Sequence, residues 1–208
     1  IINFGIDTEQ FSPKPTNFKL TKKMKIKNGF TIISMRNFEP VYDLRTLILA
    51  MPEVLSNYPE VNFLLIGKGS QEKELKDLVR ELKIESSVFF LGFVSNEDLP
   101  KFINSSDIYI STSLSDAGIA ASTAEAMACG VPVIVTDTGE NREWIKNGET
   151  GYLIPPSDPL KLAQVIQNMI LKPKEIKKVG LAGRKIISEH NDYKTEMAKV
   201  EKLYKLML

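Results

Sequence analysis

The 208-residue sequence has almost no net charge, with 27 lysine and arginine residues against 26 aspartate and glutamate residues. This balance lacks the basic excess typical of nucleic-acid binding or of a polybasic membrane patch. Hydrophobic residues make up 43% of the chain, enough for one sizeable core, but no apolar run approaches the ~20 residues of a membrane span. The single cysteine, Cys129, cannot form an internal disulfide, so a reducing, cytoplasmic setting is expected.

The beginning of the chain predicts a domain taken from a longer protein. It starts without a methionine, inside the apolar run Ile1–Asp7, and continues with a stretch rich in proline and lysine from Ser12 to Asn28. Such a composition is typical of a linker or surface loop. We therefore expect a leading segment and linker over residues 1–28, one domain over 29–190 and a C-terminal helix over 191–208.

Five short apolar or β-branched runs follow, each continuous enough to be a strand buried on both faces. Segments with the spacing of amphipathic helices lie between them. This alternation predicts an α/β fold with a doubly wound, Rossmann-like parallel sheet and helices on both faces. The expected strands are Phe30–Met35, Val61–Ile66, Val88–Leu91, Ile108–Ser111 and Val133–Thr136, and the expected closing helices are Leu160–Leu171, Glu175–Glu189 and Tyr193–Met207.

Ligands of such sheets bind at the carboxyl ends of the strands, so the loops that follow the strands are the candidate sites. Arg36 follows the first strand, and its guanidinium suits a phosphate group. A surface ion pair with Glu39 or Asp43 is the alternative. Gly67 and Lys68 lie in the turn after the second strand, where glycine permits close approach of the backbone to an anion.

The loop after the third strand supplies an apolar surface. Phe93 and Val94 are candidates for one wall of a slot for a nucleotide base, because a base needs a flat apolar neighbour. Ser95 or Asn96 is expected to cap the following helix, with acidic residues in its first turn.

The stretch SDAGIAASTAEAMACGVPVI, residues 115–134, follows the fourth strand. The helix that carries Glu125 is expected to begin within Ala120–Thr123, and small residues before it leave backbone N–H groups open to an anion. The Glu125 carboxylate can accept hydrogen bonds from a vicinal diol such as that of ribose. Alternatively, Glu125 is a favourable acid near a helix start, and the alanines provide tight helix-to-sheet packing.

Several recognisable motifs follow one another along nearly the whole chain: "FGIDTEQFSP", "SMRNFEP", "LIGKGSQEKEL", "SLSD" with "EAMACGVPVIVTDTGENREWI", and "NGETGYLIPPSDPLKLAQVI". In content and in order they resemble the motifs of the donor-binding half of retaining family-four glycosyltransferases of the GT-B fold. The resemblance implies transfer of a sugar from a nucleotide-sugar donor, such as a UDP-sugar, in polysaccharide or glycolipid biosynthesis. It implies no requirement for a metal or other cofactor. It also implies a missing N-terminal acceptor-binding domain, without which these residues bind donor but transfer nothing.

The resemblance assigns roles to matching residues. Glu125 matches the family's second acidic residue, which binds the ribose, and Arg36 matches its arginine. By the usual spacing the first acidic residue, which contacts the transferred sugar, falls on Ala117, so Asp116 takes this role only if the loop has one extra residue. The backbone N–H donors for the diphosphate and sugar are expected from Gly118, Ile119, Ala120 and Ala121.

One element of the family's phosphate site is absent from the sequence. The lysine expected five positions after Arg36 is replaced by Val41, with Tyr42 beside it. Lys68 or Arg142 is a candidate for the compensating charge. The rival functions are a non-catalytic module that binds a nucleotide or nucleotide sugar, and another GT-B-like enzyme such as a sugar epimerase.

The remaining residues of interest are expected to be structural. His190 is predicted on the surface between two helices, while Cys129 and Trp144 are predicted in the core, and no metal-ligand cluster is present. The resemblance places the turn over residues 139–141 beside the donor cleft. The expected location is cytoplasmic. The alternative is peripheral attachment of a full-length enzyme to the inner face of the membrane.

Overall fold

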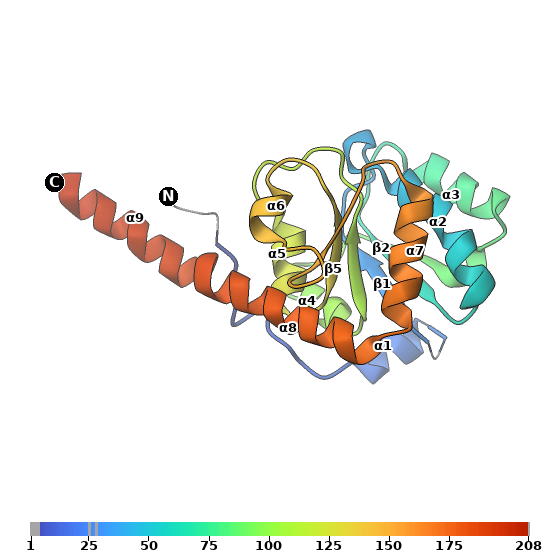
Figure 1. The fold of residues 1–208 in the computed structure, drawn as a ribbon, viewed down its shortest axis with the longest axis horizontal. Coiled ribbons are helices and arrows are strands. Elements are labelled where there is room, and N and C mark those ends of the chain that lie inside the picture. The colour runs from blue at the N-terminus through green and yellow to red at the C-terminus, as the bar shows by residue number, and fades with distance from the viewer. Residues whose placement is uncertain (1–4, 25, 28, 208) are drawn as a thin grey trace.

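The computed structural model describes residues 5–24, 26–27 and 29–207. Residues 1–4, 25 and 28 of the predicted leading segment and linker lie outside this description. Within the described residues the chain forms a six-stranded sheet with helices on both faces (Figure 1). No helix among these described residues is both long enough and apolar enough to cross a membrane.

The described strands all pair in parallel, in the order β3-β2-β1-β4-β5-β6. This confirms the predicted doubly wound, Rossmann-like fold. The chain moves outward from β1 to β3, then returns to the other side of β1, so the space between β1 and β4 is the topological switch point. The strands are β1 (Thr31–Ser34), β2 (Asn62–Ile66), β3 (Val88–Gly92), β4 (Ile108–Ser111), β5 (Val133–Thr136) and β6 (Tyr152–Ile154).

The apolar runs produce two cores because successive strand residues point to opposite faces. Ile32 belongs to the core that contains residues of α2, α3 and α7, while Ile33 belongs to the core that contains residues of α5 and α8. The helices are α1 (Phe18–Lys23), α2 (Leu44–Asn57), α3 (Glu72–Glu81), α4 (Leu99–Ile103), α5 (Ala121–Ala128), α6 (Asn141–Trp144), α7 (Pro159–Ile170), α8 (Pro173–His190) and α9 (Tyr193–Met207), with 3-10 turns η1 (Pro40–Tyr42) and η2 (Glu85–Ser87).

Some local predictions differ from the structure. The stretch predicted as a linker or loop contains α1, whose first turn is capped by the Asn17 side chain. The predicted cap of α4 at Ser95 or Asn96 is wrong, because α4 begins at Leu99. Residues 95–98 form a turn in which Asp98 N donates to Ser95 O, and a proline in the first turn of α4 favours the later start. His190 is the last residue of α8 rather than part of a loop.

Candidate functional site

Arg36 leaves the carboxyl end of β1 and is held on several sides. Its Nη2 donates to Asp116 Oδ1 over 2.6 Å and to Ser113 Oγ over 3.3 Å, while Nη1 lies 3.5 Å from Ser122 Oγ. The guanidinium carbon stands 4.3 Å from the centre of the Tyr42 ring, a cation–π contact. The Arg36 and Asp116 side chains are only 10% and 5% exposed. The loops after β1 and β4 therefore meet in a nearly buried ion pair at the switch point.

The alternative partners considered for Arg36 are engaged elsewhere. Glu39 accepts hydrogen bonds from the hydroxyl and backbone N–H of Ser70, which lower the pKa of its carboxyl. Asp43 caps α2 by accepting from Thr46 N over 3.3 Å. The alternative pairing of Arg36 with either residue is therefore wrong, because both acids accept from backbone N–H groups of their own neighbourhood and Arg36 pairs with Asp116 instead.

Two backbone constraints fix Asp116 beside Arg36. Leu114 N donates to Val41 O over 2.8 Å, which ties the loop after β4 to η1. On the other side, Gly139 has a φ of +54°, and a Cβ placed on it would lie 1.8 Å from the Asp116 carbonyl oxygen. Only glycine permits this close approach. The turn at Gly139 therefore packs directly on the backbone of Asp116, and its position beside a donor cleft stays a prediction.

The amino terminus of α5 lies in the same region and has no side-chain cap. Its N-cap residue is Ala120, which offers no side-chain acceptor. In the described part of the chain, no hydrogen-bond partner is found for the N–H of Ala121 or of Ser122. Gly118 has a φ of +70°, and Ala121 is exposed. Unpaired N–H groups at the start of a helix attract anions, so this helix terminus, beside Arg36 and its counter-ion Asp116, is a candidate anion site.

Glu125 lies in the second turn of α5, which begins at Ala121 as predicted. The side chain is half-buried, and no hydrogen bond or ion pair to its carboxylate is found among the described residues. Burial raises the pKa of the Glu125 carboxyl from an ordinary 4.5 to about 7. A poorly solvated carboxylate without a partner costs stability, and groups of this kind concentrate at functional sites.

Buried polar atoms without a partner gather around the switch point. Four of the five such side-chain atoms in the described residues belong to β1, β4 or the loops that follow them. Folded proteins seldom leave buried polar groups unpaired, so the concentration of these groups favours a site for a polar ligand. The four atoms are Ser34 Oγ, Arg36 Nε, Ser111 Oγ and Asp116 Oδ2.

The glycine turn after β2 has a clear packing role. A Cβ on Gly67 would lie 2.4 Å from the Arg36 carbonyl oxygen, and one on Gly69 would lie 2.3 Å from that of Phe38. These glycines let the loop after β2 pack against the loop after β1. Lys68 is exposed, and its role in phosphate binding stays a prediction.

The two residues predicted to form a base slot face different surroundings. Phe93 is 79% exposed, whereas Val94 is half-buried and packs against the core that contains α5. Phe93 therefore presents an apolar ring to solvent after the edge strand β3. Base binding by these residues stays a prediction.

Other predicted residues take mainly structural positions. Arg142 forms an ion pair with Asp137 on the surface, which raises the pKa of Arg142. Cys129 is buried in the core that contains α5, and burial raises the pKa of its thiol to about 12. Trp144 is half-buried against this same core, and His190 is exposed. Within the described residues, no three histidine, cysteine, aspartate or glutamate side chains form a group able to hold a metal ion.

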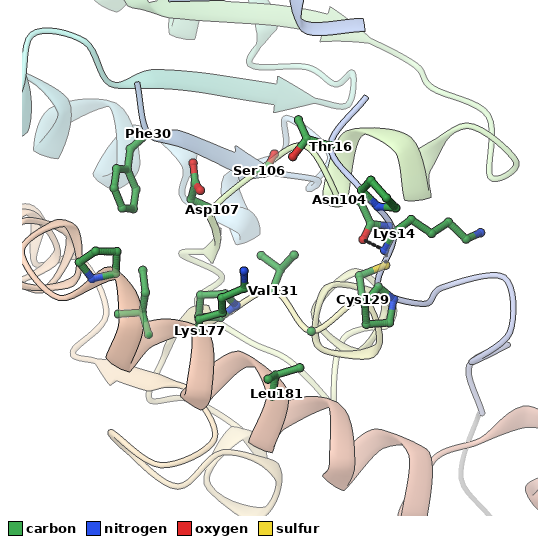
Figure 2. Close-up of a pocket in the computed structure, with 16 residues that line it drawn as sticks. Lys14, Thr16, Phe30, Asn104, Ser106, Asp107, Cys129, Val131, Lys177 and Leu181 are labelled. Atoms are coloured by element: carbon green, nitrogen blue, oxygen red, sulfur yellow. Dashed lines mark hydrogen bonds between the residues drawn. The ribbon is translucent and has the colours of Figure 1, made fainter. Parts of the chain in front are cut away.

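A cavity of about 450 Å³ lies at the other end of the strands from the candidate site, near the amino ends of β1 and β4 (Figure 2). It is bordered by Lys14, Phe30, Asp107 and Lys177, among others, and none of the predicted site residues lines it. The features that mark the candidate site are therefore its arginine, its uncapped helix terminus and its unpaired polar atoms, and not the volume of a cavity.

Three residues that contact Arg36 were missed as site residues. Tyr42 stacks on the guanidinium, while Ser113 and Ser122 approach its terminal nitrogens. For Ser113 the available signal was the run of polar residues directly after β4, because the central strands of a doubly wound sheet end beside the ligand.

The fold and the site together define a Rossmann-like domain with unpaired helix N–H groups and an arginine at its switch point, an arrangement common in domains that bind phosphorylated ligands. Comparison with known proteins identifies the family. The sequence profile of the family "Glycosyl transferases group 1" matches residues 17–186, and the chain belongs to this family.

Curated relatives are moderately similar in sequence. The chain is 28% identical over 211 residues to "Putative glycosyltransferase EpsD" of Bacillus subtilis, a match that covers 98% of the chain and 54% of that protein. It is 23% identical over 206 residues to the "GDP-mannose-dependent alpha-(1-6)-phosphatidylinositol monomannoside mannosyltransferase" of Mycolicibacterium smegmatis, covering 96% of the chain and 54% of that protein. The chain thus spans about half the length of the curated relatives it matches.

Solved structures show the same architecture. Anabaena Alr3699/HepE in complex with UDP-glucose is 26% identical, with a TM-score of 0.90, and the match covers 98% of this chain and 56% of that one. The C-terminal domain of the glycosyl transferase group 1 family protein LpcC from Francisella tularensis is 24% identical, with a TM-score of 0.82, and covers 91% of this chain and 100% of that one. The expected GT-B half-fold is confirmed.

Proposed function

We propose that this chain is the donor-binding half of a retaining glycosyltransferase, which transfers a sugar from a nucleotide sugar to an acceptor held by another part of the enzyme. The observation that carries the proposal is the uncapped start of α5 beside Arg36 at the switch point. A nucleoside diphosphate requires such a combination of backbone donors and a cation. Membership of the glycosyltransferase family supports this ligand.

The chemical role of the site follows from the charge on the leaving group. When the sugar departs, negative charge grows on the oxygens of the nucleoside diphosphate. The N–H groups of Ala121 and Ser122 and the positive end of the α5 dipole are already oriented to stabilise that charge. The guanidinium of Arg36 adds its charge once its ion pair with Asp116 has opened. In this proposal the backbone from Gly118 to Ala121 receives the diphosphate and the adjoining sugar.

The two acidic residues have different roles in the proposal. Glu125 binds the ribose, because its ionised form accepts hydrogen bonds from both hydroxyls, and the half-buried carboxylate has no competing partner among the described residues. Asp116 is 5% exposed on its side chain and faces Arg36. Its contact with the transferred sugar therefore requires the ion pair to open first.

The relatives narrow the choice of donor. The solved neighbour from Anabaena holds UDP-glucose, and the mycobacterial relative is named as GDP-mannose-dependent. UDP- and GDP-sugars are therefore the first candidates for this chain. Backbone contacts to a diphosphate do not distinguish the bases, so we assign that choice to the exposed ring of Phe93 and its surroundings.

Calorimetric titration with UDP, GDP, ADP and their sugars tests the binding half of the proposal. Wild-type protein should bind at least one of these ligands, and Glu125→Gln should weaken its binding. Glu149→Gln, which removes an exposed carboxylate from the turn before β6, is the matched control and should bind as the wild type does. Absence of binding to every nucleotide would refute the proposal.

Transfer is tested by linking the chain to its native upstream sequence and supplying labelled donor. Proton NMR of the product should show the donor's anomeric configuration retained. An inverted product would contradict the retaining assignment. Donor binding without turnover in the complete protein would instead favour the non-catalytic module.

A further inference from the structure

The positive charge of Arg36 is neutralised inside the fold. Its Nη2 donates to Asp116 Oδ1 over 2.6 Å, and both side chains are nine-tenths buried or more. We propose that Asp116 is a built-in counter-ion that competes with the donor diphosphate for Arg36, so that binding exchanges a carboxylate for a phosphate. This inference rests on the proposed function, since it concerns the phosphate-binding step of the same site.

The geometry of the ion pair suits such an exchange. Arg36 and Asp116 share a single hydrogen bond rather than the two parallel bonds of a bidentate pair. Arg36 Nε and Asp116 Oδ2 are both buried and have no hydrogen-bond partner in the part of the chain that the structure describes. The closed pair therefore leaves one donor and one acceptor unsatisfied, and a phosphate group with several oxygens can satisfy more of the guanidinium.

Arg36 is held in position by more than its counter-ion. The ring of Tyr42 covers the guanidinium at 4.3 Å, Ser113 Oγ accepts from Nη2, and Ser122 Oγ lies beside Nη1. Ser122 belongs to the first turn of α5. When Asp116 loses its charge, these contacts keep the cation next to the open N–H groups of the helix.

The charge balance explains why the carboxylate matters. The residue five positions after Arg36 is the uncharged Val41, and Arg142 is already paired with Asp137. The ion pair of Arg36 and Asp116 thus contributes no net charge toward a diphosphate. Removing the Asp116 charge restores one unit of positive charge, which at a separation of several ångströms in a half-buried site changes affinity by about fivefold or more.

The experiment is calorimetric titration of wild type, Asp116→Asn and Asp77→Asn with inorganic diphosphate, UDP and uridine. Asp116→Asn should bind diphosphate and UDP at least about fivefold more tightly than the wild type, while affinity for uridine, which has no phosphate, stays the same. Asp77→Asn is the matched control because it also removes one acid and frees one arginine, Arg80, on α3 outside the candidate site. Equal or weaker diphosphate binding by Asp116→Asn, or equal tightening by Asp77→Asn, would overturn the proposal.

A second measurement covers the case in which Asp116→Asn does not fold, as judged by circular dichroism. In wild-type protein, the NMR signal of Arg36 Nε–H should shift when diphosphate is added and stay in place when uridine is added. No shift at saturating diphosphate would overturn the proposal. Tighter diphosphate binding by Asp116→Asn together with no sugar transfer by the complete protein would remove the proposed transferase function and leave the competition between the two anions standing.

Discussion

Replacing Glu125 with glutamine should make the folded protein more stable at neutral and alkaline pH. Burial raises the pKa of this carboxyl from 4.5 to about 7, above its value in the unfolded chain. The carboxyl is neutral in both states below pH 4.5, and the fold loses stability as pH rises through the interval up to 7. Since each pKa unit is worth about 1.4 kcal/mol, the full penalty is about 3 kcal/mol.

The assay is urea denaturation of wild type and Glu125→Gln at pH 4.5, 6 and 8. At pH 4.5 the two proteins should have nearly the same free energy of unfolding. By pH 8 the variant should be more stable by up to about 3 kcal/mol, a difference of about 6 to 12 °C in melting temperature for a chain of this size. Glu149→Gln, at an exposed position, is the control and should show no comparable pH-dependent gain.

Two results would refute this reasoning. A variant that is equally or less stable than the wild type at pH 8 would mean that the Glu125 carboxylate is well solvated or paired in solution. A gain of the same size at pH 4.5 would show that packing, rather than ionisation, is responsible. The expected outcome is a carboxylate that costs stability and is kept for ligand binding, as is common at functional sites.

Three further outcomes follow from the site. Gly139→Ala should lower the free energy of unfolding in urea by at least about 2 kcal/mol, because φ is +54° and the new Cβ would clash with Asp116 O. Gly148→Ala, with φ +80° and open space around the new Cβ, should lower it by only about 1 kcal/mol. Equal losses would contradict the argument that Gly139 is required for close approach. Val41→Lys, at an exposed position, should tighten UDP binding a few-fold at low salt and lose that gain near 1 M salt; a salt-independent gain would point away from charge. Sugar transfer by the complete protein should persist in EDTA, and loss of transfer that Mg²⁺ or Mn²⁺ restores would contradict metal-independent chemistry.

The sequence indicated most of the positions of the site but few of its contacts. Arg36 and Glu125 were selected because they stand in loops or helix starts at the carboxyl edge of a predicted parallel sheet. The start of α5 was predicted because small residues precede a helical run, and the structure begins the helix at Ala121. The sequence did not indicate the ion pair of Arg36 with Asp116, because the acids close to Arg36 in the chain were the natural candidates. Tyr42 was considered only as the neighbour of the position where a lysine was expected.

The sequence by itself determined the elements and their order, because continuous apolar runs must be buried on both faces and amphipathic segments must cover them. Only the tertiary structure brought Arg36 and Asp116 together, 80 positions apart in the chain. Their contact requires β1 to lie beside β4, which depends on how the sheet reverses its order and leaves no local signal. The raised pKa of Glu125 has the same origin, because desolvation depends on packing around the side chain and not on its sequence neighbours.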